Sequence, residues 1–189
     1  MLERGYIGRA VQIVATNPFE YLVAGAVMGG LTIASFGILA GPAAGGVVAM
    51  TLKRCRGEEI DLADAFRGFE NFGSTILTGL ALAGMVLAGS VFLLVPGLIL
   101  AALFGYALPV VIDRPVSSGE AIRQARVLAA GDLLAQSIFI AVLVAVALSG
   151  AVFLLVGLAA TIPVALAALT VAYHDAAYPS TTAPGVPLD

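Results

Sequence analysis

The chain is poor in charged residues and in the side chains that usually carry catalysis or bind metals. Its 189 residues include one cysteine, one histidine and no tryptophan, and only 11% of them are charged. A soluble domain carries about 25% charged residues. A single cysteine excludes an internal disulfide and any cysteine-based metal cluster. The formal net charge of −3 is too small to indicate a nucleic-acid partner.

Catalytic combinations are also missing. His174 stands beside Asp175, but no serine, cysteine or second carboxylate lies at a spacing that would complete a nucleophilic set or a metal site. Cys55 lies between Arg54 and Arg56, a setting that can stabilise a thiolate, although a solitary cysteine is usually inert. We therefore expect no enzyme activity, no catalytic residue, no cofactor and no metal ion.

The chain does have three long apolar runs, and 60% of its residues are hydrophobic. The runs extend from Phe19 to Leu52, from Ser74 to Ile112 and from Leu133 to Tyr173. At 1.5 Å per helical residue, each can cross a hydrocarbon core of about 30 Å more than once. The sequence therefore predicts an all-α membrane protein with about six transmembrane helices, arranged as three hairpins.

The three hairpins resemble one another in sequence. The stretch from Val91 to Leu98 recurs from Val152 to Leu158, with a weaker copy from Phe36 to Pro42. A helix-breaking glycine or proline follows each apolar stretch, as a hairpin tip requires. The predicted tips are Pro42, Pro96 and Gly157.

The sequence does not decide where the first hairpin turns. A returning helix from Ala43 to Leu52 would span only about 15 Å. Either this hairpin turns earlier, near Ser35 to Gly37, or it does not cross fully. We favour a full crossing by a helix that starts near Gly37, because a membrane helix tolerates a proline such as Pro42 as a kink.

A short amphipathic segment precedes each hairpin. Its apolar residues recur at helical spacing, which predicts a helix lying flat in the headgroup region. Ser117 and Glu120 form a capping-box pattern at the start of the third segment. The repeats then cover about residues 4–52, 61–112 and 117–175 of one integral membrane domain, 1–178, followed by a disordered, proline-containing tail, 179–189. The predicted apolar faces are Ile7, Ala10, Val11 and Val14; Leu62, Ala65, Phe66 and Phe69; and Ile122, Ala125 and Leu128.

The distribution of charge predicts the topology. Lysine and arginine lie near the amphipathic segments, whereas the predicted tips carry no charge. The positive-inside rule then places both termini on the cytoplasmic side of the membrane and the tips on the other side. Glycines at four-residue spacing, Gly25 with Gly29 and Gly41 with Gly45, predict close helix packing within the chain or in a homo-oligomer.

The chain resembles a group of uncharacterised bacterial multi-pass inner-membrane proteins, related to the membrane domain fused to some glycerophosphoryl diester phosphodiesterases. The resemblance covers about residues 17–178 and implies an α-helical inner-membrane domain. It implies no phosphodiesterase activity, because the catalytic domain of those fusions has no counterpart here and a fold does not transfer function. The residues that carry it are Gly41, Pro42, Gly45, Arg56, Gly57, Glu58, Asp61, Leu62, Phe66, Gly68, Phe69, Pro96, Gly97, Pro109, Asp113, Glu120 and Ala121.

Two functions remain in competition. The first is a scaffold or accessory subunit that meets a membrane-protein partner through a docking surface of Leu62, Phe66 and Phe69 in an acidic segment. The alternative is a transporter or a lipid-handling protein, because internal repeats and broken helices are common in transporters. No charged residue lies centrally in a predicted membrane helix, which disfavours proton coupling.

Overall fold

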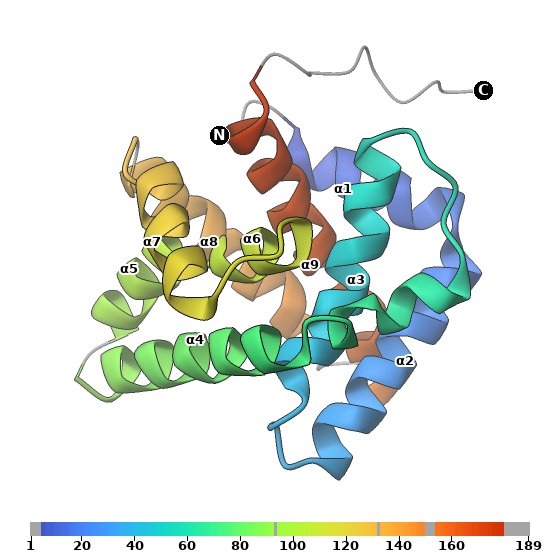
Figure 1. Cartoon of the computed structure of the whole chain (residues 1–189), viewed down its shortest axis with the longest axis horizontal. Coiled ribbons are helices and arrows are strands. Elements are labelled where there is room, and N and C mark those ends of the chain that lie inside the picture. The colour runs from blue at the N-terminus through green and yellow to red at the C-terminus, as the bar shows by residue number, and fades with distance from the viewer. Residues whose placement is uncertain (1–4, 93, 132, 150–153, 180–189) are drawn as a thin grey trace.

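The computed structural model describes residues 5–92, 94–131, 133–149 and 154–179, and all regular structure in these ranges is helical. The prediction of an all-α protein is therefore confirmed. The elements, labelled as in Figure 1, are α1 (Tyr6–Thr16), α2 (Pro18–Ala34), α3 (Ala40–Cys55), the 3-10 helix η2 (Leu62–Phe69), α4 (Phe72–Phe92), α5 (Leu94–Phe104), α6 (Ala107–Asp113), α7 (Ser118–Ala129), α8 (Leu133–Ser149) and α9 (Leu154–Ala177).

Helices α3 and α9 form the centre of the molecule. They lie side by side, α1, α2 and α8 pack on α9, and η2, α4 and α6 pack on α3 (Figure 1). The buried face of α9 includes three alanines, Ala167, Ala168 and Ala172. Small side chains let neighbouring helix backbones come close, which compensates for the lack of large core residues at these positions.

The first hairpin turns close to the earlier of the two positions considered, Ser35 to Gly37. Residues 35–39 form the turn, in which Phe36 (φ 52°) and Gly37 (φ 87°) adopt left-handed backbone conformations. The returning helix begins at Ala40, slightly later than expected, so Pro42 lies in the first turn of α3 and not at a kink within a longer helix. A proline is accommodated there because the amides of a first helical turn have no partner within the helix.

The other two predicted tips also fall inside helices. Pro96 lies in the first turn of α5 and Gly157 in the first turn of α9. Residues 93 and 150–153, which precede these helices, lie outside the described residues. In each copy the proline or glycine thus marks the start of the returning helix.

The second returning helix is broken into α5 and α6. The break lies at Gly105 and Tyr106, between the end of α5 and the start of α6. Pro109, in the first turn of α6, explains it, because proline has no amide to donate to the carbonyl of Gly105 and its ring clashes with that carbonyl.

The length and composition of single helices do not show the six predicted membrane crossings. Among the described residues, no helix alone is both long and apolar enough to span a bilayer. Two pairs of consecutive helices are long and apolar enough when their lengths are taken together, but each pair is strongly bent. They are η2 with Phe72–Leu87, bent by 78°, and α7 with Leu133–Ala147, bent by 110°.

The three amphipathic segments form α1, η2 and α7, but their buried faces differ from the predicted ones. In α1 the buried residues are Tyr6, Ala10 and Ile13, and in α7 they are Ala121, Ala125 and Ala129. In η2 they are Asp64, Ala65 and Gly68. Small residues form the buried face of α7 and most of that of η2, and η2 lies directly against the backbone of α3.

Candidate functional site

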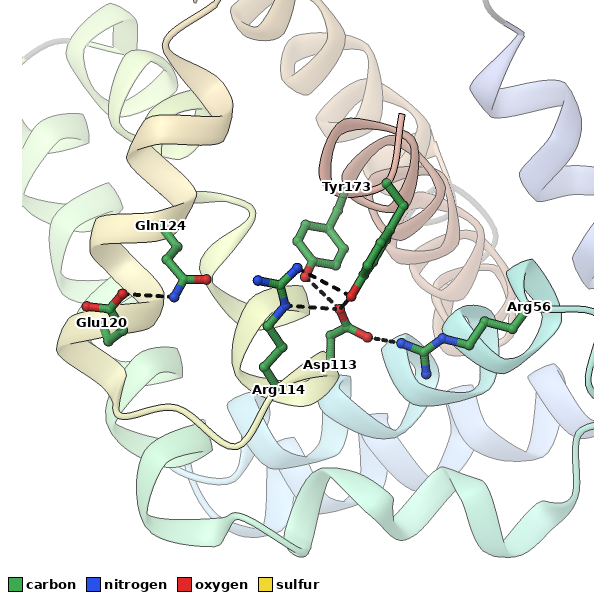
Figure 2. A network of polar contacts seen from close by, with 7 residues as sticks. Arg56, Asp113, Arg114, Glu120, Gln124 and Tyr173 are labelled. Carbon is green, nitrogen blue, oxygen red and sulfur yellow. Dashed lines mark hydrogen bonds and ion pairs between the residues drawn. The ribbon is translucent and has the colours of Figure 1, made fainter. Parts of the chain in front are cut away.

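Asp113 is the centre of a polar cluster that joins three distant parts of the chain. Its side chain is fully buried and forms an ion pair with Arg56. The hydroxyl groups of Tyr173 and Tyr178 donate hydrogen bonds to its Oδ2 over 2.9 and 2.6 Å. We call Arg56, Asp113, Arg114, Tyr173 and Tyr178 the Asp113 cluster; Figure 2 shows Arg56, Arg114 and Tyr173 around Asp113.

The ends of three elements place the cluster. Arg56 directly follows α3, Asp113 ends α6, and the two tyrosines lie in and just after the last turn of α9. The Arg114 guanidinium lies over the Tyr178 ring, 5.5 Å from its centroid. Since a buried carboxylate is tolerated only when its acceptors are satisfied, the cluster fixes these three helix ends relative to one another.

Two further ion pairs connect distant elements. Arg9 in α1 pairs with Asp175 in α9 over 2.7 Å, and Lys53 in α3 pairs with Asp64 in η2 over 2.8 Å. Burial opposes ionisation of Asp64, but hydrogen bonds from Lys53 Nζ and from the Asp61 amide outweigh it and hold the pKa of Asp64 below its ordinary value. Helical spacing predicts that Asp64 lies opposite the apolar face of its segment, on the polar side, whereas the structure buries it in η2, which packs on α3.

The contact between η2 and α3 depends on glycine. A Cβ added to Gly46 would lie 1.8 Å from the carbonyl oxygen of Ala65, and one added to Gly68 would lie 2.0 Å from the carbonyl oxygen of Pro42. Two backbones therefore touch directly here. The sequence analysis named neither glycine as a packing residue, although small residues of this kind are typical of close helix contacts.

The four predicted packing glycines differ in their surroundings. A Cβ on Gly41 would meet the backbone of Thr75 in α4 at 2.8 Å, and one on Gly45 would meet Ile112 Cδ1 at 2.7 Å. Gly25 is buried in α2. A Cβ on Gly29 would have nothing within 4 Å, so Gly29 makes no close contact with the described part of the chain.

The proposed docking residues lie on the outer side of η2. Leu62 and Phe66 are exposed, Phe66 to 53%, and Phe69 is half-buried. The rings of Phe66 and Phe69 are 6.5 Å apart, and Phe72 stacks on Phe69 at 6.1 Å. The apolar residues face outward because Ala65 and Gly68 are small enough to occupy the contact with α3. We call Leu62, Phe66 and Phe69 the η2 surface.

Reactive groups are scarce in the described part of the chain. No group of three or more His, Cys, Asp and Glu side chains there could hold a metal ion. Burial raises the pKa of the Cys55 thiol to about 11, and the nearby Arg9 opposes this shift without cancelling it. A thiol with such a pKa is a poor nucleophile at neutral pH.

From the sequence alone, Asp113 and Arg114 before Pro115 indicate the end of a helix, and Tyr173 and Tyr178 indicate an aromatic belt at the membrane interface. The partners of Asp113 are 57 to 65 residues away in the chain, so no local spacing predicts the cluster. The one available signal is an acidic residue directly after a long apolar run. Comparisons with protein-family models, with curated proteins and with solved structures found no match.

Proposed function

We propose that this protein is a non-enzymatic integral membrane protein that acts as a scaffold or accessory subunit. The observation that carries the membrane assignment is the apolar outer surface of α2, α4 and α8. Glu20 is the one charged residue in these three helices. Large contiguous apolar patches are rare on soluble monomers but cost nothing in lipid. The exposed side chains are Phe19, Leu22, Ile33, Phe72, Leu77, Leu80, Leu87, Leu134, Ile138 and Val144.

The distribution of charge supports the same proposal. The ion pairs of Arg9, Lys53 and Arg56 lie at the ends of helices or in the amphipathic segments, outside the predicted crossings. The pairing of Arg9 with Asp175 places the start of α1 next to the end of α9. Such proximity agrees with two termini on the same side of a bilayer.

Alkaline extraction tests the membrane assignment. We expect the protein to stay with the membrane pellet after a carbonate wash, because its apolar surface would be exposed to water if it were released. A peripheral protein of the same membranes, which the wash should release, is the control. Recovery of this chain in the supernatant would show that the assignment is wrong.

The scaffold role depends on the η2 surface. Leu62 and Phe66 are exposed, and the acidic residues Glu58, Glu59 and Glu70 beside them are exposed too. An apolar centre with a charged rim is typical of protein interfaces. The partner that fits is an apolar segment with basic flanks at the cytoplasmic face of another membrane protein.

Replacing Phe66 by serine tests this role. We expect the variant to keep its fold and to lose at least about tenfold in affinity for the partner, because exposed aromatic anchors carry much of an interface's binding energy. The measurement is native mass spectrometry of gently extracted protein, which gives the identity and stoichiometry of the partner. The matched control is Phe36→Ser, since Phe36 is 97% exposed in the turn before α3 and does not belong to the η2 surface. A complex equally abundant in both variants would refute docking through η2.

The alternative role is transport or lipid handling, for which uncharged polar groups in the predicted crossings are candidates. Among these, the hydroxyls of Ser35 and Thr78 donate locally to backbone carbonyls four residues earlier. Gln136 Oε1 accepts a hydrogen bond from the buried Tyr106 hydroxyl over 3.0 Å, which joins α8 to the start of α6. These oxygens are engaged within the fold, which favours the scaffold role.

A further inference from the structure

A cavity of about 380 Å³ lies between α7 and the end of α9, beside the Asp113 cluster. Arg114, Glu120 and Arg123 provide its charged lining, and Val127, Leu128 and Ala177 provide apolar lining. Figure 2 shows Glu120 and Gln124 on α7 opposite Arg114. The volume is within the range of about 300–1,000 Å³ that small-ligand sites occupy.

One wall of the cavity carries a positive group with unused donors. Within the described residues, the Arg114 guanidinium donates one hydrogen bond, from Nη2 to the Tyr178 hydroxyl over 3.4 Å. A guanidinium has five N–H donors arranged to match phosphate oxygens. Its Nε lies 3.8 Å from Asp113 Oδ2, which is too long for a hydrogen bond.

The facing wall carries a negative group that stays ionised. Glu120 accepts hydrogen bonds from Arg123 over 2.8 and 2.9 Å and from Gln124 over 2.8 Å. The hydrogen bonds from Arg123 are the main reason that the pKa of Glu120 is lowered to about 2. A carboxylate offers about four acceptor positions, so one remains for a ligand. The cavity thus presents separated positive and negative groups.

We propose that this cavity binds the headgroup of a zwitterionic phospholipid, with the phosphate at Arg114 and the ammonium at Glu120. A phosphate ester with a nearby amine places one charge of each sign within a few ångströms, as the cavity does. Val127, which is 71% exposed, and Leu128 cover the first methylene groups of the lipid. The source of the ligand rests on the membrane part of the proposed function, because α7 must lie at headgroup depth to meet a lipid of the bilayer, whereas binding of the headgroup by the cavity does not.

Short-chain lipids test the proposal without a membrane. Dihexanoyl-phosphatidylethanolamine, kept below its critical micelle concentration, is titrated onto the purified full-length protein and followed by calorimetry. We expect saturable binding of one lipid per chain, and at least about tenfold weaker binding of dihexanoyl-phosphatidylglycerol and of inorganic phosphate, because loss of a charged hydrogen bond has about this effect. Equal binding of the two lipids, or tight binding of phosphate alone, would overturn the assignment.

Three variants locate the binding site. Glu120→Gln should abolish the preference for the ethanolamine lipid. Arg114→Gln should lower the affinity for both lipids by at least about tenfold. Val127→Glu should weaken lipid binding through charge at the apolar mouth and leave the fold intact, because this side chain is exposed. Val11→Glu, on the exposed side of α1, is its matched control. Equal affinity in these two valine variants would disprove the location.

The outcomes separate this inference from the membrane assignment. If alkaline extraction releases the protein and the short-chain lipid still binds, headgroup binding by the cavity is supported and the membrane assignment is wrong. If the protein stays in the membrane and no short-chain lipid binds, the cavity assignment fails alone.

Discussion

Replacing Gly46 by alanine is expected to lower the free energy of unfolding by about 3 kcal/mol or more, at the upper end of the effects of overpacking. The added methyl carbon would lie 1.8 Å from the Ala65 carbonyl oxygen and 2.5 Å from its carbonyl carbon. Both atoms belong to the backbone, so no rotamer change can relieve the overlap. Helix η2 must then move away from α3, and the pair of Lys53 with Asp64 must lengthen with it.

The measurement is unfolding of the purified protein in detergent micelles, titrated with sodium dodecyl sulfate and followed by circular dichroism. Gly84→Ala is the control, because Gly84 lies inside α4 and has nothing within 4 Å of a Cβ position. Alanine there should leave the protein as stable as before or up to about 1 kcal/mol more stable, since it favours the helix. Equal stability of the two variants would mean that α3 and η2 do not touch as described.

Replacing Asp113 by asparagine should have the second large effect, a loss of about 3 kcal/mol of unfolding free energy. The substitution keeps the shape of the side chain but removes the charge that Arg56, Tyr173 and Tyr178 share. The side-chain amide nitrogen of the asparagine would face the Arg56 guanidinium or a tyrosine hydroxyl, which now donate to the carboxylate. At least one buried polar group would then lack a partner. The same unfolding titration measures the loss.

Glu59→Gln is the control for this substitution, because Glu59 is an exposed acidic residue and the same change of charge there should alter stability by less than about 0.5 kcal/mol. Tyr178→Phe removes one of the hydroxyl donors and should cause an intermediate loss. A fully stable Asp113→Asn variant would contradict the buried position of this carboxylate.

The helical content was predictable from the sequence, and the places where helices begin and break were less so. Three apolar runs and three amphipathic segments sufficed to predict an all-α chain. The prolines were assigned to turns, whereas Pro42 and Pro96 lie in first helical turns. The same property of proline, its missing amide, permits both positions, so the sequence alone does not distinguish a turn from the helix start that follows it. The break at Gly105 was readable from Pro109, four residues later.

The Asp113 cluster and the contact of α3 with η2 were not predictable, for two physical reasons. Residues such as Arg56 and Tyr173 acquire their roles from partners far away in the chain, and helical periodicity describes only neighbours. In η2, the amphipathic pattern grouped Ala65 with Phe66 on one apolar face, opposite Asp64. A backbone contact through Gly46 and Gly68 instead buries Ala65 together with Asp64 and leaves Phe66 exposed, because small residues can allow a closer approach than large apolar ones.

The wide sequence separation within the Asp113 cluster also bears on biosynthesis. Asp113 emerges from the ribosome about 60 residues before Tyr173 and Tyr178, which are its hydroxyl donors. Arg9 likewise precedes Asp175 by 166 residues. Until α9 is made, the Asp113 carboxylate lacks its two tyrosine donors, and Arg9 lacks its counter-ion Asp175. Helix α9, which is synthesised after the other described helices, therefore completes both contacts, and a chain that stops before it carries an incompletely satisfied acid at the end of α6.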